Sequence, residues 1–393
     1  MSCLLILKAF LSQSGNLKII NIEEINRLGV EMMQKADLNR LKKCMQRAED
    51  GEELVIAFLG GSITQGSLAT KAENTYAYRV FSWWKKTFPK ADLHYVNGGI
   101  GGTTSHYGVS RVVTDILMYQ PDFVVVDFSV NDEPDEFFEE TYEGMIRRLL
   151  LWDSKPAVLL LNNVFYDTGK NAQEYHNAIG EWYQIPYVSI KDTVYKRMQS
   201  AEYTMDELTE DGLHPNDKGH KLVAEEITAF LQHVKEQEKN QEDTEYKLPK
   251  PLTANAYEHA RRLTIREVSP KLDGFHADTE EKTGHLDHFK NGWIGRKPGD
   301  SIRFEIEASC IAVQYRKTIQ KPALRAQLIL DADEQHPVLL DGNFEENWGD
   351  CLYLETVLHH GKKALHTVDI CILSDDIQAA DAAPFYLMAL ITA

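Results

Sequence analysis

Basic residues are scarce in this chain of 393 residues, and long apolar runs are absent. Lys and Arg number 42 against 60 Asp and Glu, which makes the net charge −18. Because nucleic acids and anionic membranes attract basic surfaces, we expect neither to be a principal partner. No run approaches the ~20 apolar residues of a membrane-spanning helix. The charge instead favours a neutral or small substrate.

Cysteine is also sparse. The five cysteines are scattered and show no Cys-x-x-Cys spacing, so we predict reduced thiols rather than a disulfide framework. The apolar start, residues 1–11, has no basic lead and no small-residue cleavage site, which argues against a signal peptide. We therefore predict a cytoplasmic location. The oligomeric state stays open.

The usual nucleotide-binding motifs are missing. A glycine-rich turn, Asn-Gly-Gly-Ile-Gly-Gly-Thr-Thr-Ser at 97–105, follows a predicted strand. No Gly-Lys-Ser/Thr follows it, and Thr104 stands where Gly-x-Gly-x-x-Gly requires its last glycine. We predict no cofactor.

Metal-binding motifs are missing too, since there is no His-Glu-x-x-His. The two histidine pairs, at 285/288 and 359/360, are expected to face solvent. The acidic stretch 331–334 offers oxygen ligands for calcium, but we expect a solvated turn. We predict no metal.

What the chain does contain is a regular alternation of strands and helices. Five apolar runs alternate with helical patterns, which predicts a parallel sheet covered on both faces. Ligands of such sheets lie beyond the carboxyl ends of the strands. The predicted strands are 54–59, 93–96, 123–128, 157–161 and 187–190, and the predicted helices are 75–88, 106–119, 135–152, 172–183, 193–199 and 217–234.

The pattern changes after a highly polar stretch. Short runs, in which apolar and polar residues often alternate, follow and are separated by turn residues; they predict an all-β sandwich. The runs are 301–307, 311–315, 326–330, 352–358 and 367–373. We predict four segments: an N-terminal helical extension at 1–50, a catalytic domain at 51–234, a linker at 235–252 and a β-sandwich domain at 253–393.

Four short motifs with polar residues lie at the ends of predicted strands or in the loop before the last predicted helix. Ser62 follows the first strand in Gly60-Gly61-Ser62, the glycine turn follows the second, and Asn131 follows the third. Asp211 and His214 form an Asp-x-x-His in the late loop, where the carboxylate can meet one imidazole nitrogen and leave the other for a serine. Together they predict a nucleophile, a base and an orienting carboxylate.

These motifs resemble the blocks of the SGNH hydrolases, the GDSL-type esterase superfamily, over about residues 50–234. The resemblance implies a flavodoxin-like three-layer α/β fold and a serine hydrolase. It implies Ser62 as the nucleophile, His214 as the general base and then acid, and Asp211 as the orienting residue. The implied oxyanion donors are the amides of Ser62 and Gly102 and the side chain of Asn131.

The sequence departs from the family pattern at two positions. Gly61 stands where the name motif has Asp, and Ser129 where glycine is usual, but neither position supplies a catalytic group. Gly102 rather than Gly101 is chosen from the register with the following threonines. An α/β-hydrolase elbow fits less well, because Thr64 occupies its final glycine.

The domain order is similar to that of two-domain acetylmannan esterases (carbohydrate esterase family 17), in which a sugar-binding module helps to close the active site. This resemblance implies a jelly-roll-like second domain and an acetylated plant oligosaccharide, mannan first, as substrate. Trp293 and Trp348, beside Asn and Gly in predicted loops, are expected to stack on sugar rings, with a place in the sandwich core as the alternative for each. A lipase or thioesterase of the same superfamily and a carbohydrate-binding protein with a vestigial triad are the other readings.

Overall fold

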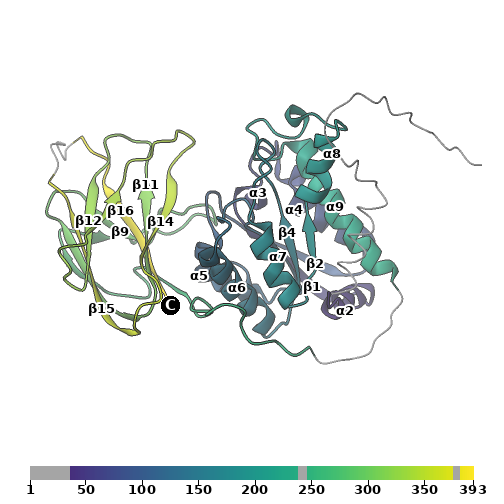
Figure 1. Ribbon diagram of the computed structural model, residues 1–393, viewed down its shortest axis with the longest axis horizontal. Coiled ribbons are helices and arrows are strands. Elements are labelled where there is room, and N and C mark those ends of the chain that lie inside the picture. The colour runs from purple at the N-terminus through teal and green to yellow at the C-terminus, as the bar shows by residue number, and fades with distance from the viewer. Residues whose placement is uncertain (1–35, 238–245, 375–380) are drawn as a thin grey trace, which may run out of the picture. The chain divides into compact units, whose positions relative to one another are not determined.

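The computed structural model describes residues 36–237, 246–374 and 381–393 (Figure 1). Its first sheet is parallel and has the order β2-β1-β3-β4-β5. This is the flavodoxin-like order, in which the direction of winding reverses beside the first strand. The strands are β1 (Glu53–Gly60), β2 (Asp92–Gly99), β3 (Phe123–Asp127), β4 (Ala157–Asn162) and β5 (Tyr187–Ser189).

Helices cover both faces of this sheet. Successive strand side chains point to opposite faces. On β1, Ile56 and Phe58 therefore join one apolar cluster, with α2, α4 and α9, while Ala57 and Leu59 join another, with α5, α6 and α7. The helices are α2 (Asn39–Glu49), α3 (Ser62–Gln65), α4 (Tyr76–Thr87), α5 (Ser105–Asp115), α6 (Glu136–Leu151), α7 (Gln173–Trp182), α8 (Lys196–Gln199) and α9 (Asp217–Glu236).

The second domain consists of two antiparallel sheets, and strand β16 is the central strand of one of them. One sheet has the order β13-β12-β15-β10-β7 and the other β14-β11-β16-β9-β8, with β6 also paired to β16. One apolar cluster takes side chains from both sheets, as in a sandwich. The strands are β6 (Arg261–Leu263), β7 (Lys271–Asp273), β8 (His276–Ala277), β9 (Trp293–Gly295), β10 (Ser301–Ala308), β11 (Ile311–Lys317), β12 (Arg325–Leu330), β13 (Val338–Asp341), β14 (Cys351–Leu358), β15 (Ala364–Ile372) and β16 (Phe385–Thr392).

The described residues from 36 onward form one compact unit, and contacts join its two sheet systems. The Arg147 guanidinium on α6 donates to the Glu258 carboxylate at 2.6 Å. Tyr257 and Cys310 complete the apolar cluster that contains α5 and α6. The first domain therefore buries part of its helical layer against residues of the second.

The predicted α/β fold with a following antiparallel β domain is confirmed. Most boundaries in the α/β domain differ by one or two residues, and three elements differ in more than that. β2 continues to Gly99, into the predicted turn; the helix predicted at 106–119 is α5 followed by a short 3₁₀ turn at Leu117–Tyr119; and the helix predicted at 193–199 is a π-helical turn at Lys191–Tyr195 followed by α8. The apolar start, most of the predicted extension and part of the linker lie outside the described residues. The domain boundaries and the jelly-roll topology stay predictions. Among the described helices, none is long and apolar enough to cross a membrane.

Candidate active site

Ser62, His214 and Asp211 come together although Ser62 and His214 are 152 positions apart in the chain. His214 Nε2 lies 2.8 Å from Ser62 Oγ, and His214 Nδ1 lies 2.6 Å from Asp211 Oδ2. Ser62 is 7% exposed. This is a continuous hydrogen-bonded path from a carboxylate through an imidazole to a hydroxyl, the arrangement that activates a serine.

The turn that carries Ser62 is held by close backbone packing. β1 ends at Gly60 and α3 begins at Ser62, so the hydroxyl stands at the carboxyl edge of the sheet. A Cβ at Gly61 would lie 2.1 Å from Asn131 Oδ1. A larger residue at 61 would therefore displace the Asn131 side chain from its present position against the nucleophile turn.

The Asp211 carboxylate is fixed by its own loop. Its Oδ1 accepts the backbone N–H groups of Leu213 at 2.9 Å and His214 at 2.8 Å. Partial burial raises the pKa of Asp211, but the hydrogen bonds from His214 and these amides outweigh it and lower the pKa to about 2. The carboxylate is therefore ionised at neutral pH, and as a hydrogen-bond acceptor it selects the imidazole tautomer with hydrogen on Nδ1.

Three N–H donors of the predicted oxyanion site have no protein acceptor within the described chain. Ser62 begins α3, so its amide has no acceptor within the helix. The amide of Gly101 donates to Gln65 Oε1 at 2.6 Å, whereas no acceptor faces the amide of Gly102 or the side-chain nitrogen of Asn131 in the described residues. This difference favours Gly102 over Gly101 as a donor.

The two predicted sugar-stacking tryptophans have opposite surroundings. Trp348 is 54% exposed, and a Cβ at Gly102 would lie 3.5 Å from its Cη2 atom. Ile100 of the glycine turn packs with Leu352 and Tyr386 of the β domain. The β domain therefore places an exposed aromatic ring beside the glycine turn.

The expectation for Trp293 is wrong. Trp293 begins strand β9 instead of lying in a loop, and it is 1% exposed. Its ring packs edge to face on Phe304 in the core between the two sheets. The hydrophobic effect favours burial of so large a ring, and no sugar can stack on it there.

The acidic turn at 331–334 and the histidine pair at 359/360 are both engaged in hydrogen bonds. Asp331 and Asp333 both lie in an exposed turn, as expected. The Asp331 carboxylate is hydrogen-bonded to the His366 ring, and the Asp333 carboxylate to the His336 ring. His359 and His360 are exposed but not free. Their rings bond to Tyr257 and Glu140, respectively.

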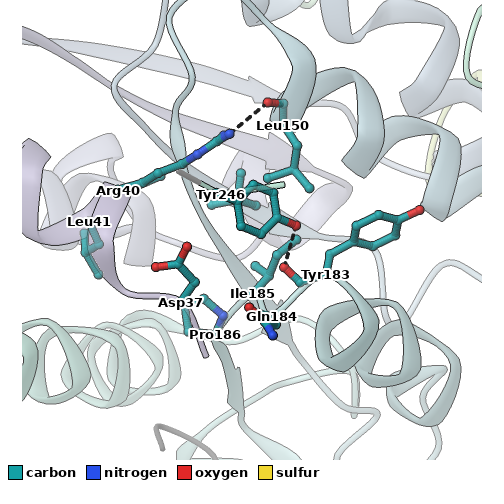
Figure 2. A pocket seen from close by; sticks show the side chains of 11 residues that line it. Asp37, Arg40, Leu41, Leu150, Tyr183, Gln184, Ile185, Pro186 and Tyr246 are labelled. Atoms are coloured by element: carbon teal, nitrogen blue, oxygen red, sulfur yellow. Dashed lines mark hydrogen bonds between the residues drawn. The ribbon is translucent and has the colours of Figure 1, made fainter. Parts of the chain in front are cut away.

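A separate hollow lies at the opposite edge of the parallel sheet. It is lined by Ala157 at the start of β4 and by Pro186 just before β5. Figure 2 shows Arg40 donating to the Leu150 carbonyl at 3.1 Å and the Tyr246 hydroxyl donating to the Tyr183 carbonyl at 2.9 Å. These polar groups join neighbouring segments, and the hollow lies at the amino edge of the sheet, away from Ser62 at the carboxyl edge.

Known proteins resemble this chain in sequence and in fold. The profile of the GDSL-like lipase/acylhydrolase family matches residues 58–222. The crystal structure of a two-domain esterase active on acetylated mannans is 47% identical, covers 92% of this chain and 98% of its own, and superposes with a TM-score of 0.88. A co-crystal of such an esterase with mannopentaose gives 47% identity, 92% and 97% coverage and a TM-score of 0.87.

This chain belongs to the GDSL-like lipase/acylhydrolase family. A more distant relative is the thioesterase 1/protease 1/lysophospholipase L1 of Escherichia coli (strain K12). It is 26% identical over 195 residues, which are 47% of this chain and 86% of that protein.

Two positioning residues of this acylhydrolase were missed from the sequence. The Arg111 guanidinium, 1% exposed, donates to the carbonyls of Gly60 at 2.9 Å and Gly98 at 2.6 Å. It therefore joins the ends of β1 and β2, from which the nucleophile turn and the glycine turn start. The Gln65 side chain accepts the hydrogen bond of the Gly101 amide through Oε1. Neither residue belongs to a recognisable motif, so only the folded positions identify them.

Asn131→Ala tests the side-chain donor of this acylhydrolase. Loss of one oxyanion donor costs about 10²–10³-fold in kcat, and we expect that loss with little change in KM for a small aryl acetate. The measurement is steady-state kinetics, with the thermal midpoint as the control for folding. A kcat within twofold of wild type would remove Asn131 from the oxyanion site.

The buried carboxyl of Asp127 lies under the nucleophile turn. Its Oδ2 accepts from the Thr64 hydroxyl at 3.0 Å and from the Asn163 amide at 2.9 Å, and Oδ1 has no partner. Burial raises the pKa of Asp127 to about 7, despite the opposing hydrogen bonds from Asn163 and Thr64. The folded protein therefore keeps a proton there that the unfolded chain releases near pH 4.

Asp127→Asn should make stability less dependent on pH. Between about pH 4 and 7 the wild type loses up to ~1.4 kcal/mol of unfolding free energy per pH unit at this group, because only the unfolded chain releases the proton. Asn keeps the oxygen acceptor and has no proton to release. We measure the free energy of unfolding in urea at pH 5 and at pH 7. Over this range the difference between the unfolding free energies of the variant and the wild type should shift by about 2 kcal/mol in favour of the variant. The exposed Asp153→Asn is the control, and an equal pH profile for wild type and Asp127→Asn would contradict the assignment.

Proposed function

We propose that this protein is a serine esterase that removes O-acetyl groups from mannan-type oligosaccharides. The observation that carries the proposal is the hydrogen-bonded series Asp211–His214–Ser62. The 47% identity to an esterase active on acetylated mannans, over both domains, supports the substrate class. The net charge of −18 suits a neutral sugar better than an anionic ligand.

The first half of the reaction forms an acetyl-enzyme. His214 Nε2 accepts the Ser62 proton as Oγ attacks the acetyl carbonyl carbon. Negative charge then develops on the carbonyl oxygen, where the amides of Ser62 and Gly102 and the Asn131 side chain can donate to it. His214 returns the proton to the sugar oxygen as the ester bond breaks, and the sugar leaves with a free hydroxyl.

The second half regenerates the enzyme. A water molecule gives its proton to His214 Nε2 and attacks the acetyl carbon, and the same donors stabilise the second tetrahedral intermediate. Ser62 Oγ then leaves with the proton from His214, and acetate is released. Asp211, ionised because of its hydrogen bonds, stabilises the imidazolium that forms in each half.

We propose Trp348 as the sugar-contacting residue. Its ring is exposed and borders the Gly102 backbone, and Phe344 supports it edge to face at a centroid separation of 4.9 Å. A sugar whose acetyl carbonyl reaches Gly102 therefore comes within reach of this ring. Apolar C–H faces of sugars pack on aromatic rings in the same way as other apolar groups.

A substrate panel tests the proposed function. Acetate release is measured from acetylated manno-oligosaccharides, acetylated xylo-oligosaccharides, a long-chain aryl ester and an acyl thioester. We expect the highest kcat/KM on the manno-oligosaccharides. A preference for the long-chain ester or the thioester would assign this chain to the activity named for its Escherichia coli relative, and absence of turnover on every ester would leave a carbohydrate-binding protein.

Trp348→Ala should separate sugar binding from chemistry. Loss of one stacking contact, ~1.4 kcal/mol, should raise KM for the acetylated manno-oligosaccharide about tenfold. The kinetics on a small aryl acetate should change less than about twofold, because that substrate has no sugar to stack. Trp182→Ala, at a 45% exposed tryptophan on α7, is the matched control. Equal losses on both substrates would make Trp348 a structural residue.

We also propose that the protein acts in the cytoplasm on imported oligosaccharides. The four cysteines within the described residues are free: Cys44, Cys310, Cys351 and Cys371. Free buried thiols suit a reducing compartment. Fractionation of producing cells tests the location, and recovery of the protein in the culture medium would contradict it.

A further inference from the structure

We propose that Glu140, His359 and His360 form a binding site for a divalent transition-metal ion, zinc by the nature of the donors. One donor atom of each residue lies within 4.8 Å of the donor atoms of the other two. Two imidazoles and one carboxylate are a donor set that zinc takes in proteins, with the fourth position left to water. The site is separate from the proposed esterase chemistry and does not depend on it.

The carboxylate of this site is already oriented. Glu140 lies on α6 and is 4% exposed. Its Oε1 accepts the backbone N–H of Ala256 at 2.7 Å, which leaves Oε2 directed at His360 Nε2, 2.6 Å away. Tetrahedral zinc at its usual bond lengths keeps ligand atoms about 3.3 Å apart. The metal would therefore replace one shared proton and open this contact by about 0.7 Å.

The second imidazole is held by an outer partner. His359 Nδ1 lies 2.9 Å from the Tyr257 hydroxyl, and Phe137 packs edge to face on the same ring. Histidines that bind metal commonly engage their other ring nitrogen with such a partner, which fixes the tautomer and the ring orientation. The two histidine rings lie 4.1 Å apart between centroids, so one ion can reach both.

The proposed ion would join two parts of the fold that are far apart in sequence. Glu140 belongs to the helical layer of the catalytic sheet, whereas His359 and His360 form the turn after β14. Trp348 precedes the other end of the same strand by a few residues. An ion here would therefore stabilise the attachment of the strand that leads to Trp348.

The test uses the full chain without a histidine tag, freed of metal with a chelator. We expect one zinc ion to bind per chain in calorimetry and to raise the thermal midpoint by about 3 °C at 100-fold excess over its dissociation constant. Cobalt(II) should bind in its place and show the visible absorption of a low-coordinate site. Absence of saturable binding by either metal would overturn the proposal.

Variants locate the site. His360→Gln and His359→Gln should each weaken zinc binding at least tenfold, and Tyr257→Phe about tenfold, because it removes only the outer partner. The controls are His336→Gln, at an exposed histidine that also bonds a carboxylate, and the double variant His285→Gln/His288→Gln. Both controls should bind zinc as the wild type does. Loss of binding in the double variant but not in His360→Gln would place the ion elsewhere and overturn the assignment.

Discussion

Ser62→Ala should lower kcat on acetylated oligosaccharides and on small aryl acetates by about 10⁶-fold, the order of effect seen when a serine hydrolase loses its nucleophile. The side chain is almost fully buried, and its hydroxyl makes one hydrogen bond, to His214 Nε2. Removal of one oxygen from a helix start leaves the fold intact. We therefore expect the thermal midpoint to change little while turnover falls to the background.

Covalent labelling makes this prediction independent of the substrate. A fluorophosphonate should modify wild type at Ser62 and leave Ser62→Ala unlabelled. Ser82→Ala is the matched control, since Ser82 is an exposed helical serine that bonds the Tyr78 carbonyl. Labelling of the Ser62→Ala protein at another serine, with activity retained, would contradict the proposed nucleophile.

Asp211→Asn should lower kcat by about 10⁴-fold with the loop geometry kept. Asn can still accept the amides of Leu213 and His214 through its oxygen, but it then turns an NH₂ group toward His214 Nδ1. The imidazole must accept that hydrogen bond and carry its proton on Nε2, where it can no longer take one from Ser62. The expected result is a loss of kcat, with KM and thermal midpoint near those of wild type.

The chain contains its own control for Asp211. Asp333 and His336 have the same Asp-x-x-His spacing, and Asp333 Oδ2 lies 2.9 Å from His336 Nδ1. His336 is on the exposed surface of the β domain. Asp333→Asn should therefore leave kcat unchanged. Equal losses in Asp211→Asn and Asp333→Asn would indicate a general effect on folding and would contradict the proposed role of Asp211.

These two Asp-x-x-His segments show what the sequence pattern can and cannot decide. In both, the short loop is enough to bring carboxylate and imidazole together, because the contact is local. The segment at 211–214 also faces Ser62, and that pairing depends on the tertiary packing that brings the loop before α9 to the carboxyl end of β1. The sequence favoured the segment at 211–214 because Ser62, the glycine turn and Asn131 each follow a predicted strand end.

The tryptophans and glycines show the opposite case. Trp293 and Trp348 have similar neighbours in sequence, yet one begins a buried strand and the other is exposed beside Gly102. Burial depends on which face of a strand meets the second sheet, and the predicted strands did not include β9. Likewise, the choice of Gly102 over Gly101 came from register alone, and its structural support is the Gln65 side chain that occupies the Gly101 amide.

The sequence by itself determined the α/β fold and its succession by an all-β domain, and it predicted the residues at the carboxyl edge of the sheet. These follow from strand and helix periodicity and from motifs next to strand ends, which are local properties. Only the tertiary structure decided which tryptophan is exposed, that Arg111 joins two strand ends, and that Glu140 meets His359 and His360. Each of these depends on contacts between segments far apart in the chain, and such contacts leave no periodic or motif signal in a single sequence.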